Sequence, residues 1–153
     1  MKTNIWLSIL ALFFLLTNGW AQNNPWFEDF QAAKAQAGKT GKYILLNFSG
    51  SDWCIWCKRL SNEVFVKDDF FQYANDNLIL AVADFPRQNN QSAEIKAQNE
   101  ALLKKYNIRG FPTVLILDPE GNLVFQTGYR QGGADAYVSH VKAIIEQHLA
   151  QND

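Results

Sequence analysis

Three short apolar runs along the chain are each bounded by turn residues, which is typical of buried β-strands. They cover residues 43–48, 78–83 and 114–117. A fourth run, 123–127, follows the third after a polar turn rich in Asp, Pro, Gly and Asn. The third and fourth runs are therefore expected to form an antiparallel hairpin.

Between these runs, apolar residues recur at a spacing near 3.6, which predicts amphipathic helices. Gly38 is expected to end the first helix, and Ser92 can cap the start of a later one. Asn99 interrupts the apolar stripe of that later helix. The expected helices span residues 26–37, 54–64, 67–75, 92–106 and 135–149.

The order of these elements predicts one α/β domain with a mixed central sheet and helices on both faces. Strands separated by helices are expected to run parallel, and the hairpin adds an antiparallel edge. The polar stretch 87–91 is expected to be an exposed connection.

The N-terminal residues have the features of a secretory signal peptide. Lys2 precedes an apolar run of about 12 residues, and the small residues Gly19 and Ala21 precede the expected cleavage point. An uncleaved membrane anchor is the alternative, but the run is shorter than the roughly 20 residues that span a bilayer. We therefore expect a signal peptide at 1–21 and an exported domain at 22–153.

The charge balance narrows the classes of partner. The chain has 14 Lys and Arg against 15 Asp and Glu, a formal net charge of −1, and loss of Lys2 with the signal peptide makes it −2. A nearly neutral charge balance gives no sign of the basic patch that would bind nucleic acid or an anionic membrane. We expect no nucleic-acid partner, no cofactor and a monomer.

The chain has only two cysteines, Cys54 and Cys57, placed between an apolar run and a helical pattern. Disulfides persist after export, but a bridge across so short a loop restricts the unfolded chain little, so a structural staple is a weak explanation. The N-terminus of a helix offers free N–H groups and a positive dipole end, which favour a thiolate. Cys54, nearer that terminus, should gain most.

Two segments and the order of elements together resemble the thioredoxin superfamily. Residues 53–58, Trp-Cys-Ile-Trp-Cys-Lys, follow a strand and open a helix, and residues 110–113, Gly-Phe-Pro-Thr, precede the hairpin. The resemblance covers nearly all of residues 22–153. It implies a thioredoxin-like fold and a thiol-disulfide oxidoreductase, which the expected signal peptide would place in the periplasm or outside the cell.

The resemblance also implies a mechanism. Cys54 would attack a protein disulfide, and Cys57, expected to be the more buried, would resolve the mixed disulfide. A separate redox partner would recycle the cysteines. The direction of electron flow stays open, because it depends partly on Ile55 and Trp56, which replace the Gly-Pro of thioredoxin.

By the same resemblance, the peptide bond before Pro112 should be cis. The backbone of Phe111, Pro112 and Thr113 would then lie opposite the cysteines and bind substrate, with Trp53 forming an apolar contact surface beside them. An ordinary trans proline at the start of a strand is the alternative. Trp56 could lie at the surface or in the core.

Asn47 occupies the position where thioredoxin has a buried acid that helps to move a proton to or from the second cysteine. An amide cannot titrate, so water or another group would have to take that role. The reading that we favour is that Asn47 satisfies a buried hydrogen bond.

Several charged or titratable residues could either influence the cysteines or be ordinary solvated surface residues. Asp52 would oppose formation of a thiolate at the cysteines, whereas Lys58 and Arg59 would favour it. We expect all three to be solvated on the helix surface. Two histidines of the last helix are also expected at the surface: His140 and His148.

Two other functions are weighed against the oxidoreductase. One is a thioredoxin-like binding module in which the Cys54–Cys57 pair stays oxidised. The other is delivery of a soft ion such as Cu(I) through two thiolates, but no Met or His lies nearby in sequence to complete a site. We expect no metal site.

Overall fold

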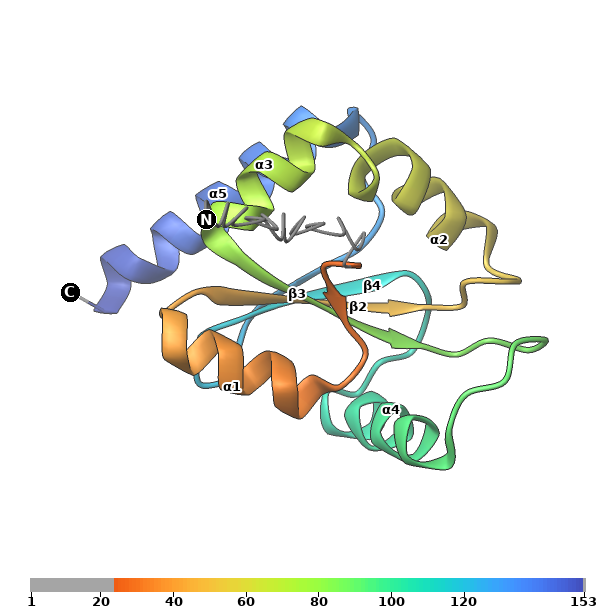
Figure 1. Cartoon of the computed structure of the whole chain (residues 1–153). Helices are drawn as coiled ribbons and strands as arrows, with labels where there is room; N and C mark the ends of the chain where they lie inside the picture. Colours follow the sequence, from red (N-terminus) through yellow and green to blue (C-terminus); the bar gives the residue numbers. More distant parts are fainter. Residues whose placement is uncertain (1–23, 153) are drawn as a thin grey trace, which may run out of the picture.

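The computed structural model of the protein describes residues 24–152, which form a five-stranded sheet flanked by helices (Figure 1). The strand order is β1-β3-β2-β4-β5, so β2 and β3 lie inside the sheet. The strands are β1 (Trp26–Phe27), β2 (Tyr43–Ser49), β3 (Leu78–Asp84), β4 (Thr113–Leu117) and β5 (Leu123–Thr127).

The sheet is mixed, as expected, but one strand direction differs from the prediction. β3 runs parallel to β2, and the β4–β5 hairpin is antiparallel, both as predicted. β4, however, is antiparallel to β2 and therefore to β3. The chain leaves β3 at Asp84, opposite Ser49, and returns at Thr113, opposite Phe48, so it re-enters the sheet at the end where it left.

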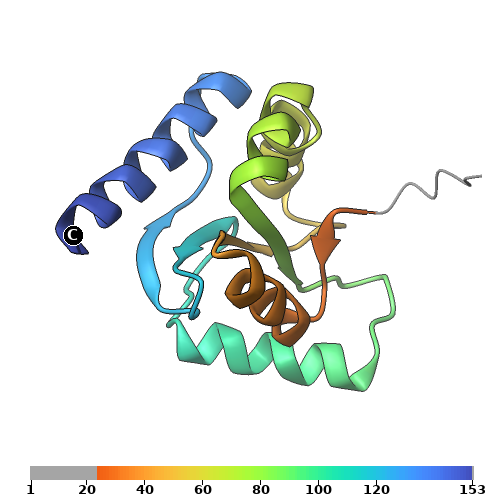
Figure 2. The ribbon, with the colours of Figure 1, turned by 60° about the vertical axis from the view of Figure 1, so that its left-hand side comes forward.

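Helices cover both faces of the sheet, in agreement with the prediction (Figures 1 and 2). One face carries α1 (Phe30–Thr40) and α4 (Ala93–Lys105). The other carries α2 (Ile55–Leu60), the π-helical turn η1 (Ser61–Phe65), α3 (Asp68–Asn77) and α5 (Gly133–Asn152).

The side chains of β2 separate the core into two clusters. Leu45 points toward α3, η1 and α5, whereas Ile44, Leu46 and Phe48 point toward α1 and α4. Every residue of β2 is buried, because helices cover both faces of this central strand. The loop that carries the cysteines therefore starts from a rigid part of the molecule.

The first helix begins and ends later than predicted. Trp26 and Phe27 form the short edge strand β1 beside β3, and Asp29 caps α1 by accepting from the N–H groups of Gln31 and Ala32. Gly38 lies inside the helix. The helix ends at Gly41, whose φ of 68° suits glycine and whose N–H bonds to the carbonyl of Ala37.

The helix expected after Cys54 is present, with a change of winding within it. Residues 55–60 are α-helical and residues 61–65 form one π-helical turn. The next expected helix is α3. Asn99, which interrupts the stripe of α4, is 1% exposed, and its Nδ2 donates to the backbone carbonyl of Asp84 at 2.9 Å. Asn99, the polar residue that interrupts the apolar stripe, therefore anchors α4 to the end of β3.

Within residues 24–152 we find no helix with the length and apolar character needed to cross a bilayer. The segment 1–21, interpreted as a signal peptide, lies outside the residues that the structure describes.

Candidate redox site

The two cysteines form a disulfide at the junction between β2 and α2. Cys54 is the N-cap of α2, and its Sγ accepts a hydrogen bond from the N–H of Cys57 at 3.2 Å. The N–H of Cys54 in turn donates to the carbonyl of Gly50 at 2.8 Å. A sulfur that caps a helix and receives an N–H bond is stabilised as a thiolate once the disulfide is reduced.

The expected difference in burial between the two cysteines is not observed. Cys54 is 6% exposed and Cys57 is 5% exposed. Their surroundings nevertheless differ, because Cys54 precedes Ile55, which is 74% exposed, whereas Cys57 lies within the helix and lines a cavity that opens to the surface.

The bond between Phe111 and Pro112 is cis, which confirms the prediction. The Phe111 ring packs edge-on against Trp53, with ring centroids 5.8 Å apart. Thr113 is buried, and its hydroxyl donates to the carbonyl of Gly110 at 2.7 Å. The segment 111–113 thus lies beside the loop that carries the cysteines.

Trp53 forms part of an aromatic surface next to the disulfide. It is 37% exposed, and its indole N–H donates to the carbonyl of Phe85 at 2.8 Å. The guanidinium of Arg87 lies 4.1 Å from the centre of one Trp53 ring, within the range of a cation–π contact. Phe85 and Arg87 have no feature in the sequence that marks them as neighbours of the cysteines.

Asp52 does not face the cysteines as a free charge. Its carboxylate accepts from the backbone N–H groups of Gln88 at 2.7 Å and Arg87 at 3.0 Å, and from Asn89 at 3.4 Å. These bonds, that of Gln88 first, hold the pKa of Asp52 below its ordinary value. The expected solvated carboxylate instead fastens the exposed connection after β3 to the redox loop.

Lys58 and Arg59 also have specific partners. The Lys58 ammonium donates to the backbone carbonyl of Asp52 at 2.8 Å. Arg59 bonds to Glu63 at 2.6 Å, an i,i+4 ion pair, and Glu63 also accepts from the hydroxyl of Tyr129 at 2.6 Å. These two bonds, that of Arg59 first, hold the pKa of Glu63 below its ordinary value.

Trp56 lies at the surface, which decides between the two interpretations of this residue. It is 49% exposed, its ring centroid lies 5.2 Å from that of Tyr129, and the Arg59 guanidinium lies 5.4 Å from its ring. The spacing of Arg59 and Glu63 could have suggested their ion pair from sequence. No local pattern could have brought Tyr129 to them, because it follows β5.

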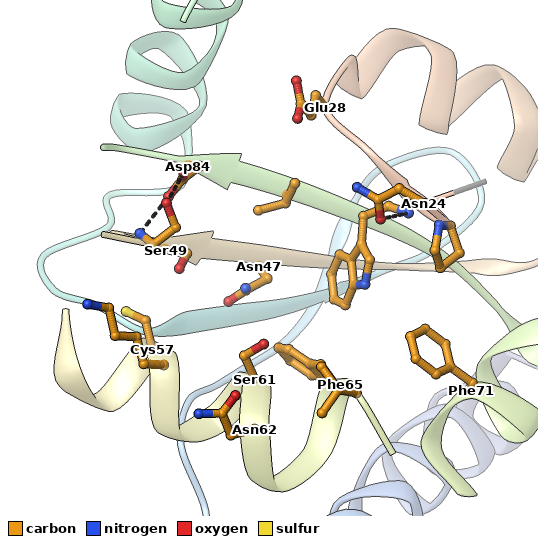
Figure 3. Close-up of a pocket in the computed structure, with 16 residues that line it drawn as sticks. Asn24, Glu28, Asn47, Ser49, Cys57, Ser61, Asn62, Phe65, Phe71 and Asp84 are labelled. Atoms are coloured by element: carbon orange, nitrogen blue, oxygen red, sulfur yellow. Dashed lines mark hydrogen bonds between the residues drawn. The ribbon is translucent and has the colours of Figure 1, made fainter. Parts of the chain in front are cut away.

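Asn47 is buried without the hydrogen bond that we favoured for its side-chain oxygen. It is 9% exposed, and its Oδ1 has no partner among the described residues. The residue lines a cavity of about 670 Å³ between the sheet and the helix that carries Cys57 (Figure 3). Ser49, Ser61 and Asp84 line the same cavity.

The two histidines of α5 are half-buried rather than at the surface. His140 Nε2 lies 3.2 Å from the hydroxyl of Thr127, and His148 Nδ1 lies 2.8 Å from that of Tyr43. Burial, with a smaller effect of Arg130, lowers the pKa of His140. Residues 24–152 contain no cluster of three or more His, Cys, Asp or Glu that could hold a metal ion.

Comparisons with known proteins agree with this geometry. A family model described as a thioredoxin-like domain matches residues 30–141. The disulfide bond reductase DsbH of Chlamydia pneumoniae is 34% identical over 126 residues, which are 82% of this chain and 75% of that protein. The thiol:disulfide interchange protein DsbD of Yersinia pestis is 38% identical over 92 residues, which are 60% of this chain but only 14% of the relative.

Solved structures give the same result. A structure titled DsbH oxidoreductase superposes with a TM-score of 0.76 at 33% identity and covers 79% of this chain and 83% of its own. A thioredoxin from Thermus thermophilus superposes with a TM-score of 0.62 at 14% identity, covering 84% of this chain and 92% of its own, which supports the fold alone.

Proposed function

The chain belongs to the thioredoxin-like domain family and is a thiol-disulfide oxidoreductase, and on this basis we propose that it is exported and exchanges the disulfides of other proteins. The observation that carries the proposal is the Cys54–Cys57 disulfide at the start of α2, beside the cis Phe111–Pro112 segment. In this arrangement a sulfur at a helix N-terminus meets an aromatic surface on which a polypeptide can lie.

We assign the attacking role to Cys54 and the resolving role to Cys57. In the reduced protein, the Cys54 thiolate attacks a substrate disulfide, and one substrate sulfur leaves as a thiolate. Cys57, as a thiolate, then attacks Cys54, which re-forms the Cys54–Cys57 disulfide and releases the second substrate sulfur. Two electrons pass to the substrate in each cycle, and its two thiolates take up two protons.

The surroundings of Cys54 support this assignment. Its Sγ receives the N–H of Cys57, and it precedes Ile55, an exposed hydrophobic residue. Both features favour the nucleophile of the first step, which has to be a thiolate and has to meet the substrate.

We propose that the substrate lies across Trp53 and the segment Phe111, Pro112 and Thr113. Pairing of β4 with β5 begins at Val114, which supports a role for the preceding backbone in holding a substrate strand. The side chain of Thr113 is engaged within its own turn, so this residue would act through its backbone. Ile55 and Trp56, both exposed, would tune the redox potential and contact the partner.

We propose that electrons flow from the protein to its substrates. The relative from Chlamydia pneumoniae, which shares 34% identity, is named a disulfide bond reductase, and this supports the reducing direction. A reductase needs a second redox protein to reduce its disulfide after each cycle, and a thiol:disulfide interchange protein similar to the DsbD relative is a suitable class of partner.

The test of activity uses the mature protein and a disulfide-bonded protein such as insulin. We expect the protein to accelerate the reduction of insulin by dithiothreitol, and Cys54→Ser to abolish the acceleration. Cys57→Ser should instead accumulate a mixed disulfide through Cys54. Full activity of Cys54→Ser would refute the mechanism.

The direction is tested by the equilibrium reduction potential of the Cys54–Cys57 pair in glutathione buffers. A value near the roughly −270 mV of thioredoxin supports a reductase, and one near about −120 mV supports an oxidant. A pair that stays oxidised throughout the accessible range would indicate a binding module without turnover.

Export is tested separately. We expect mass spectrometry of the protein from its own cells to show a mature N-terminus at Gln22, and fractionation to place it outside the cytosol. A cytosolic chain that retains residues 1–21 would contradict this part of the proposal.

A further inference from the structure

The connection between β3 and α4 is fastened to the loop that carries the cysteines, and the two lie side by side in Figure 1. The N–H of Phe85 donates to the carbonyl of Ser49 at 2.8 Å, and the indole N–H of Trp53 donates to the carbonyl of Phe85 at 2.8 Å. The Asp52 carboxylate accepts from the backbone N–H groups of residues 87–89. This connection is therefore a held part of the surface beside the disulfide.

The side chain of Arg87 lies over Trp53, the residue that precedes Cys54. Its guanidinium carbon is 4.1 Å from the centre of a Trp53 ring, and Arg87 is exposed. The indole also packs closely against Gly50 and meets Phe111 edge-on. A polypeptide that lies across Trp53 therefore meets a guanidinium together with the indole, rather than a bare aromatic ring.

No ion pair among residues 24–152 neutralises the charge of Arg87. The ion pairs of this part of the chain join Arg59 to Glu63 and Lys142 to Glu146. Arg87 donates through its backbone N–H to Asp52, and its guanidinium makes no hydrogen bond to the described residues.

The other cations beside the cysteines are engaged. Arg59 also lies over an aromatic ring, that of Trp56, but its charge is paired with Glu63. The Lys58 ammonium donates to the carbonyl of Asp52. Arg87 is thus the cation of this surface whose side chain has donors left for a ligand.

The stacked guanidinium is suited to a carboxylate. Contact with the ring uses one face of the planar group, and its N–H donors point outward in the plane, where two of them can bind the two oxygens of one carboxylate. Stacking also restricts the side chain before the ligand arrives, so less conformational entropy is lost on binding. An Asp or Glu side chain of a polypeptide on this surface supplies such a carboxylate.

We propose that Arg87 is a specificity-determining residue, which binds an acidic side chain close to the reacting cysteine of the substrate. The pair forms as the substrate docks, and it favours disulfides that have Asp or Glu beside the cysteine. Sulfur exchange at Cys54 proceeds in the same way for every substrate. This inference rests on the proposed function and on the placement of the substrate across Trp53.

The test compares capped peptide disulfides that differ at one residue beside the cysteine, which is Asp, Asn or Lys. One series carries this residue before the cysteine and a second series carries it after. The second-order rate constant for oxidation of the reduced protein is measured by acid quench and mass spectrometry. In at least one series we expect the Asp peptide to react about fivefold faster than the Asn peptide, the upper range for a solvent-exposed ion pair. This preference should shrink toward unity in about 1 M salt, because salt screens exposed charges.

Three variants assign the preference to Arg87. Arg87→Gln should abolish it and leave the rate with the Asn peptide unchanged, and Arg87→Glu should reverse the order, so that the Lys peptide reacts fastest. Lys39→Gln is the control for net charge. Lys39 is an exposed residue in the last turn of α1, which precedes the start of β2, whereas the cysteines follow its end. This control should keep the wild-type preference.

Three results would overturn the inference. One is equal rates for the Asp and Asn peptides of both series in the wild type. Another is an equal slowing of both peptides by Arg87→Gln, which would mean that Arg87 only holds Trp53 in place. The third is an unchanged order of peptides in Arg87→Glu. If the reduced wild type is oxidised by none of the peptides, the proposed function itself fails, which is a different outcome.

Discussion

Gly50→Ala is expected to displace Trp53 and so to damage the aromatic surface beside the disulfide. A Cβ on Gly50 would lie 2.4 Å from Trp53 Cε2 and 2.7 Å from Nε1, closer than real Cβ contacts. Gly50 is not among the glycines with a positive φ, so the expected effect of alanine there is steric. The substitution therefore tests the close approach of this backbone to the indole ring.

The expected loss can be estimated from the contacts of Trp53. If the ring moves, the hydrogen bond to the Phe85 carbonyl breaks, which costs about 0.5–1.5 kcal/mol. The edge-on contact with Phe111 is lost as well, at about 0.5–1.5 kcal/mol. We expect the free energy of unfolding to fall by about 1–3 kcal/mol and kcat/KM for insulin reduction to fall with it.

Urea denaturation followed by far-UV circular dichroism measures the stability, and the insulin assay measures activity. Gly110→Ala is the matched control, since its added Cβ meets nothing within 4 Å, and both quantities should stay near those of the wild type. Wild-type stability and activity in Gly50→Ala would show that Trp53 does not depend on this close packing.

Three further predictions concern the groups that support the site. Asp52→Asn should lower the free energy of unfolding at neutral pH, because backbone N–H bonds, that of Gln88 first, stabilise the Asp52 carboxylate and lower its pKa in the folded state. The stability that these bonds give is present above the ordinary pKa of 3.8 and is lost as the pH falls below that value. Denaturation curves of the two proteins should therefore converge in acid. Tyr137→Phe removes a bond to the Gly128 carbonyl and should cost about 0.5–1.5 kcal/mol in urea denaturation, whereas an unchanged midpoint would contradict the role of that bond. Phe70→Ala leaves a cavity at a fully buried position and should lower the free energy of unfolding by about 3–5 kcal/mol. A much smaller loss would indicate that neighbouring core residues fill the cavity.

The sequence determined the fold class and the centre of the site. The apolar runs identified β2, β3 and β4, because strands buried on both faces have few polar residues, and the polar turn after β4 identified β5, which is largely exposed. The two cysteines and Pro112 identified the redox centre, because each is a short local motif. The edge strand at Trp26 and Phe27 was missed, since two residues are too short to show a period.

The groups that surround the disulfide could not be identified before the fold was known. Lys58 is exposed, as expected, but its ammonium also donates to the carbonyl of Asp52. The Asp52 carboxylate, expected in solvent, accepts from the backbone of a distant loop. Tyr129 joins Glu63 across 66 residues of sequence, and Asp84 meets Ser51 across 33. These contacts depend on the order in which strands pair, which local residue patterns do not specify. The sequence alone identified the two cysteines, whereas the groups that hold the loop around them became visible only when β2 and β3 were placed side by side.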